Sequence, residues 1–75
     1  MKRLYSSDEV IKVLLRMGFQ YAPKRGKGSH IALYKETPSG NRLVIIPHRK
    51  ELAKGTLHAI LKQAGITLEE LEKYV

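Results

Sequence analysis

The chain has 75 residues, no cysteine, and 14 Lys and Arg against 7 Asp and Glu, which gives a formal net charge of +7. This length predicts one domain, residues 1–75, with a small core, and the lack of cysteine excludes disulfides and thiolate metal sites. The longest apolar run, Leu43 to Ile46, is too short for a signal peptide or a membrane span. We therefore expect a cytoplasmic protein with no membrane segment.

The positive charge is concentrated in the middle of the chain. Residues 12–62 contain eleven Lys and Arg but only two acids, Glu36 and Glu51. A concentrated excess of this kind favours a polyanionic partner such as RNA. The alternative is a soluble domain that is simply rich in lysine.

The first predicted element is a helix that follows Ser6. Ser6 and Glu9 have the spacing of a capping box, and Gly18 is well placed to end the helix. Between them, apolar residues recur at helical spacing: Val10, Val13, Leu14 and Met17.

Three strands are predicted next, at residues 19–23, 29–36 and 42–47. The basic, glycine-containing residues 24–28 form the first connection, and the turn-rich residues 37–41 form the second. Pro23 cannot donate a ladder hydrogen bond, so we expect it at a strand end or sheet edge. Short connections of this kind are typical of an antiparallel meander.

Two helices are predicted in the last third of the chain. Thr56 is expected to cap the first, which Gly65 ends. Thr67 and Glu70 form a second capping box, which opens a short final helix. The predicted order is α-β-β-β-α-α, an α+β fold in which helices cover one face of a three-stranded antiparallel sheet.

Side chains alternate between the two faces of a strand, which predicts the residues that point to the face of the sheet left uncovered by the helices. We call this the open face. We expect the inward positions to be Ile31, Leu33, Leu43 and Ile45. We expect the open face to carry His30 and an apolar strip of Ala32, Tyr34, Val44 and Ile46. An exposed apolar strip indicates a protein partner, and the alternative is a face covered by Lys and Arg side chains.

Residues 24–30, which read KRGKGSH, combine cations, glycines and a histidine. Cations and exposed backbone amides suit a phosphate, and histidine readily exchanges protons near neutral pH. RNA carries its own nucleophile, the 2′-hydroxyl, so no metal or other cofactor is expected. His30 is the predicted general acid or base. His48, Tyr34 and Ser29 remain candidates for a second proton-transfer group.

The start of the helix at Gly55 and Thr56, with Lys54 just before it, offers a further phosphate site, because unpaired amides and the helix dipole favour anions there. The alternative is a capped helix with solvated lysines. The predicted RNA-binding residues are Lys24, Arg25, Lys27, Gly28, Ser29, Lys54 and Thr56.

Several short motifs appear in an ordered set: Gly28, Ser29 and His30 before a strand, Pro47 and His48 after the next, and the runs 54–57 and 60–66. Together they resemble the HicA toxins of bacterial and archaeal toxin–antitoxin pairs. The resemblance implies a fold similar to double-stranded-RNA-binding domains, cleavage of mRNA that halts translation, and a HicB-like antitoxin that masks the toxin. The family's catalytic histidine falls on His30.

Two other functions remain open at this point. A non-catalytic RNA-binding module of the same fold would use His30 only to contact phosphate. A protein-interaction domain would use the open sheet face alone. For the toxin, we expect the antitoxin to dock on the open face beside His30, with Tyr34 as its anchor.

Overall fold

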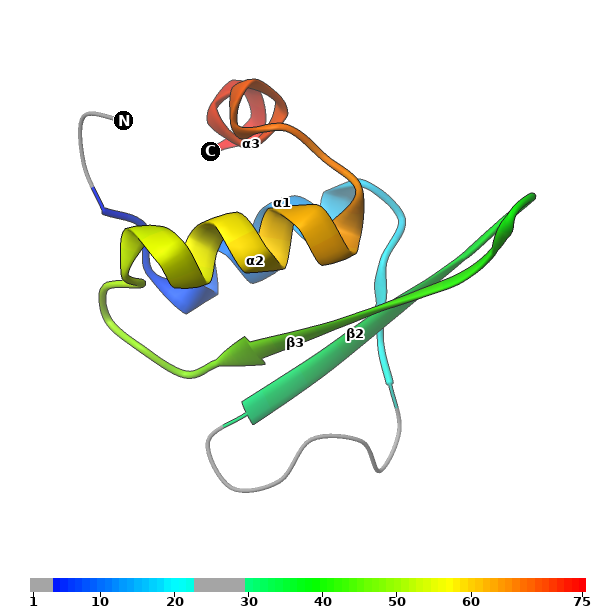
Figure 1. Cartoon of the computed structure of the whole chain (residues 1–75), viewed down its shortest axis with the longest axis horizontal. Helices are drawn as coiled ribbons and strands as arrows, with labels where there is room; N and C mark the ends of the chain where they lie inside the picture. Colours follow the sequence, from blue (N-terminus) through cyan, green and yellow to red (C-terminus); the bar gives the residue numbers. More distant parts are fainter. Residues whose placement is uncertain (1–3, 23–29) are drawn as a thin grey trace.

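The computed structural model describes residues 4–22 and 30–75. Its elements are α1 (Ser7–Arg16), β1 (Gln20–Tyr21), β2 (His30–Thr37), β3 (Gly40–Pro47), α2 (Lys54–Ala64) and α3 (Leu68–Tyr74). The predicted α-β-β-β-α-α order is confirmed. The sheet lies at one side, α1 and α2 lie side by side on one of its faces, and α3 lies beyond them (Figure 1). Within the described ranges, no helix combines the length and apolar character that a bilayer span requires.

Both predicted capping boxes are present. In α1, the Glu9 amide donates to Ser6 Oγ at 3.1 Å, and the Ser6 amide donates to Glu9 Oε1 at 2.9 Å. Thr67 and Glu70 make the equivalent pair at the start of α3. These bonds satisfy amides of the first helical turn, which have no partner within the helix.

The predicted cap of α2 is wrong. The helix begins three residues earlier than expected, at Lys54, with Ala53 as an N-cap that makes no side-chain hydrogen bond. Thr56 therefore lies inside the first turn. The early start follows from packing, because Leu52 and Leu57 are both fully buried and fix the chain on either side of Ala53.

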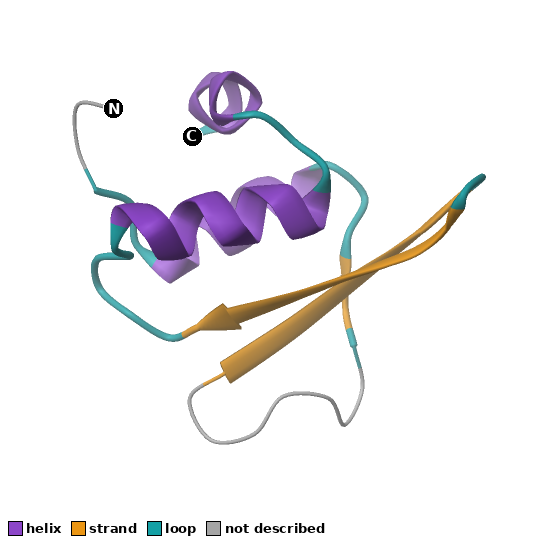
Figure 2. Ribbon diagram, in the orientation of Figure 1, coloured by secondary structure: helices purple, strands orange, loops and turns teal. Residues whose placement is uncertain are grey.

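The three strands form an antiparallel sheet in the order β1-β2-β3 (Figure 2). β1 is shorter than predicted, with only two residues, although the Ala22 amide continues the pairing by donating to the Ala32 carbonyl. A two-residue turn joins β2 to β3, so that Thr37 lies opposite Gly40. This register places Leu33 opposite Val44 and hence on the same face of the sheet.

The predicted facing of β2 agrees with this register, whereas that of β3 is wrong. Val44 and Ile46 are completely buried under the helices. Leu43 and Ile45 lie on the open face, where they are 43% and 36% exposed. The physical reason is the two-residue turn, because the turn sets the register and a shift of one residue would exchange the two faces.

The core lies between the sheet and the helices, and every helix contributes to it. Its fully buried side chains include Val10, Leu14, Leu33, Val44, Ile46, Leu52, Leu57 and Leu71. The last helix, α3, is attached through Leu71 and through a bond from the Tyr5 hydroxyl to Glu72 Oε2 at 3.3 Å. The chain segment before α1 thereby contacts the C-terminal helix.

A side chain of α2 reaches the free edge of β3. The Ile45 amide donates to Gln63 Oε1 at 3.1 Å, and Arg42 Nη1 donates to the Gln63 carbonyl at 3.2 Å. Gly65 ends the helix with φ of +75°, and a Cβ there would lie 2.7 Å from Arg42 Cζ. The left-handed backbone explains why the helix end favours glycine, since the flexible end of the Arg42 side chain could move aside.

Candidate nucleic-acid interface

His30 is the first residue of β2 and is exposed. Its cross-strand neighbour is Pro47, the last residue of β3. His30 shares the open face with Ala32 and Tyr34, because alternate residues of a strand point to the same side. The histidine therefore stands at the end of the sheet where β2 begins and β3 ends.

The predicted phosphate-binding residues that precede His30 are Lys24, Arg25, Lys27, Gly28 and Ser29. All five lie outside the described residues. Their predicted role stays a prediction.

Residues 48–53, which connect β3 to α2, are fixed against the start of α1. The Ser7 amide and the Ser7 hydroxyl both donate to the Arg49 carbonyl at 3.0 Å, and the Arg49 amide donates to Ser7 Oγ at 3.0 Å. Three residues later, the Leu52 amide donates to the Tyr5 carbonyl at 2.7 Å. We name residues 48–53 the connecting loop.

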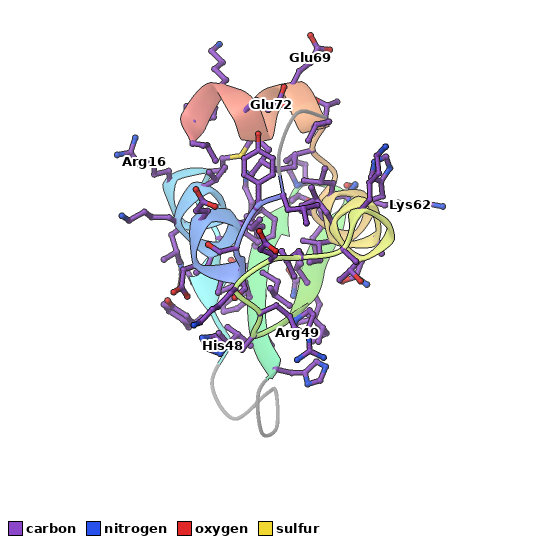
Figure 3. All side chains as sticks on the ribbon, turned by 90° about the vertical axis from the view of Figure 1, so that its left-hand side faces the viewer. Arg16, His48, Arg49, Lys62, Glu69 and Glu72 are labelled. Carbon is purple, nitrogen blue, oxygen red and sulfur yellow. The ribbon has the colours of Figure 1, made fainter. Side chains whose placement is uncertain are left out.

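The connecting loop begins directly after the neighbour of His30. Figure 3 shows His48 and Arg49 at the end of the molecule opposite Glu69 and Glu72 of α3. His48, Arg49 and Lys50 are all exposed. The sheet end that carries His30 therefore also carries cations, while the acidic residues of α3 lie far from it.

The start of α2 adds positive charge next to the connecting loop. Lys54 and His58 are exposed and, with Gly55, line an open depression of about 300 Å³. The first turn contains no acidic residue. Thr56, predicted to bind RNA here, is half-buried in the same turn. The amides and dipole of a helix start suit an anion.

The open face of the sheet carries an apolar surface, but its members differ from those predicted. Val44 and Ile46 are core residues and cannot contact a partner. Leu43 and Ile45 take their places beside Tyr34, because the register pairs Tyr34 with Leu43 and Ala32 with Ile45. Ala32 is only 4% exposed and therefore offers little surface to a partner. The Tyr34 hydroxyl donates to Gln20 Oε1 at 3.3 Å, which holds its ring on this face.

Sequence reasoning missed the contact that fixes the connecting loop. Ser7 is 1% exposed and makes the bonds to Arg49, yet it directly follows a serine that has an evident role as a cap. The spacing to Glu9 assigns the cap to Ser6, but no pattern indicates a role for Ser7. Among residues 4–22 and 30–75, no three His, Cys, Asp or Glu side chains are grouped so that they could hold a metal ion.

The comparison with protein families gives one match. The family described as the HicA toxin of bacterial toxin–antitoxin pairs matches residues 7–66, from the start of α1 to just past the end of α2. No curated protein matches the chain. Since the family match covers most of the chain, this protein belongs to the HicA toxin family and is the toxin of a toxin–antitoxin pair.

Proposed function

We propose that this toxin is an endoribonuclease that cleaves mRNA in the cytoplasm and so inhibits translation. The observation that supports this proposal most directly is the position of His30. It is an exposed proton carrier at a sheet end shared with Arg49 and Lys50, in a chain with a net charge of +7. Cations recruit the phosphate backbone, and the histidine acts on it.

The cleavage uses the 2′-hydroxyl of the RNA as nucleophile. His30 takes the proton of that hydroxyl as a base, or gives a proton to the departing 5′-oxygen as an acid. Each such proton transfer is worth about 10²–10⁴-fold in rate. Lys24, Arg25 or Lys27 offsets the charge that develops on the phosphorus oxygens, and the amides of Gly26 and Gly28 add donors. The reaction needs no metal ion.

Replacement of His30 by Ala tests this assignment. Lys62→Ala is the control, because Lys62 is exposed in the last turn of α2, away from the helix start. In buffer with EDTA, we expect His30→Ala to abolish RNA cleavage and Lys62→Ala to retain it, with both variants unfolding at the same temperature as the parent. Cleavage by a folded His30→Ala variant would refute the assignment, and a requirement for added divalent metal would refute the metal-free reaction.

A non-catalytic RNA-binding module is the second candidate, favoured by the concentration of cations alone. It predicts that the purified chain binds RNA in a salt-dependent manner and leaves it intact. The same assay separates the two candidates, since only the first produces fragments.

We also propose that a HicB-like antitoxin covers the open face of the sheet. The proposed interface consists of Tyr34, Leu43 and Ile45 around Ala32, on the face that His30 shares. A partner docked there buries apolar area and blocks access to the histidine at once.

Leu43→Asp tests this interface, with Ala59→Asp on the exposed side of α2 as a control of equal charge. We expect Leu43→Asp to weaken antitoxin binding in isothermal titration by about tenfold or more, and Ala59→Asp to leave it nearly unchanged. Equal affinities for both variants would place the antitoxin elsewhere.

A further inference from the structure

Arg49 is held by its backbone rather than by its side chain. Both of its backbone polar groups are bonded to Ser7, which is 1% exposed and belongs to the first turn of α1. The Ser7 amide is one of the donors that a helix start leaves without a partner. The Arg49 carbonyl of the connecting loop thus accepts a hydrogen bond from this otherwise unpaired amide, and the bonds to Ser7 fix the position of the loop.

A second anchor lies three residues further on. Leu52 is fully buried and its amide donates to the Tyr5 carbonyl. The chain is therefore fixed at Pro47 by strand pairing, at Arg49 by Ser7, and at Leu52 by burial. A segment fixed at three points loses little conformational entropy when a ligand binds it.

This arrangement places Arg49 at the same end of the sheet as His30. Two residues span at most about 7 Å between Cα atoms, and Arg49 is two residues after Pro47, the cross-strand neighbour of His30. The guanidinium group is exposed and has no ion-pair partner in the described part of the chain. It presents five donors in a planar fork that matches phosphate oxygens.

We propose that Arg49 is the residue that anchors an RNA phosphate beside His30, and that Ser7 is the positioning residue that holds it there. This inference rests on the proposed function and names a substrate contact within that site. Lys50 is the natural comparison, because it carries the same charge in the same loop but makes no hydrogen bond to other residues of the described chain. A fixed fork binds phosphate better than a solvated, mobile ammonium group.

The experiment compares Arg49→Ala with Lys50→Ala. Binding is measured at several salt concentrations with a short single-stranded RNA whose 2′-O-methyl groups prevent cleavage. We expect Arg49→Ala to weaken binding about tenfold or more and to lower the salt slope by about 0.7. Lys50→Ala should weaken binding less than about threefold. Arg49→Lys, which keeps the charge but loses the fork, should lie between them.

The role of Ser7 is tested by a double-mutant cycle. Ser7→Cys keeps the size of the side chain but makes only weak hydrogen bonds, and it serves where Ser7→Ala fails to fold. We expect it to weaken binding in the parent protein and to have no further effect in the Arg49→Ala background, because a positioning residue acts only through its partner. A purely structural defect would weaken both backgrounds equally.

The outcomes separate this inference from the proposed function. Salt-dependent RNA binding by the parent with equal losses for Arg49→Ala and Lys50→Ala refutes the anchor alone. An effect of Ser7→Cys that persists without Arg49 refutes the positioning role. A parent protein that binds no RNA even at low salt refutes the proposed function itself.

Discussion

The facing of β3 yields the sharpest test of the fold, because neighbouring residues should respond to one substitution in opposite ways. Val44 is completely buried, whereas Leu43, the residue before it, is 43% exposed. We expect Val44→Asp to unfold the protein and Leu43→Asp to leave it folded.

The magnitudes follow from burial. Val44→Asp removes a buried apolar side chain worth about 1.5–3 kcal/mol. It also places an unpaired carboxylate in the core, which adds about 3–5 kcal/mol. A chain of 75 residues has a total stability of about 4–11 kcal/mol, so this one change removes most or all of it. Leu43→Asp removes a half-exposed side chain and should cost about 1 kcal/mol.

Thermal unfolding followed by far-UV circular dichroism measures both changes. Leu43→Asp should lower the melting temperature by about 4–8 °C, while Val44→Asp should show no cooperative transition. Where that variant cannot be purified, Val44→Ala provides the comparison, with an expected loss of about 2 kcal/mol. A Leu43→Asp variant as unstable as Val44→Asp would show that the register is not the one described.

Two further predictions concern the helix ends, and thermal unfolding measures both. Ser6→Ala should cost about 1 kcal/mol because it removes the cap of α1, whereas Thr56→Ala should cost less than about 0.5 kcal/mol because Thr56 does not cap α2; equal losses would contradict the observed start of α2. Gly65→Ala should cost about 1–2 kcal/mol, since its backbone is left-handed and the new methyl would displace Arg42. Gly55→Ala, with open space around its Cα, should instead stabilise α2 by about 0.5–1 kcal/mol, and a loss of stability there would contradict this reasoning.

The elements with strong local signals could be predicted from sequence alone. The capping boxes at Ser6 and Thr67 each combine a hydroxyl with a carboxylate three residues later, and both form as expected. The facing of β2 was also predictable, because the strand alternates and Lys35 and Glu36 follow its apolar residues.

The facing of β3 could not be predicted from its own residues. Residues 43–46 are all apolar, so no alternation of polar and apolar residues shows which of them point to the core. The missing information was the turn length. A two-residue turn at Pro38 and Ser39 pairs Thr37 with Gly40 and so determines which residue faces Leu33.

The position of the candidate site was predicted in part. The exposure of His30 follows from its place in an alternating strand. The hydrogen bonds between Ser7 and Arg49 join residues that are 42 positions apart in the chain, and no local sequence pattern predicts such a contact. The start of α2 was misplaced for a similar reason, because the burial of Leu52 by distant parts of the chain determines it.

The bond between Gln63 and Ile45 bears on how this protein avoids unwanted association. β3 is an edge strand, and the free amides of such strands invite pairing with strands of other molecules, which leads to aggregation. Here the outward amide of Ile45 is occupied by a side chain of the same molecule, and Pro47 has no amide to offer. A molecule of this protein that is free of its partner therefore offers few amides for strand addition at the end of β3 that contains Ile45 and Pro47. Substitution of Gln63 would leave the fold's core intact but restore a donor from which intermolecular sheets can grow.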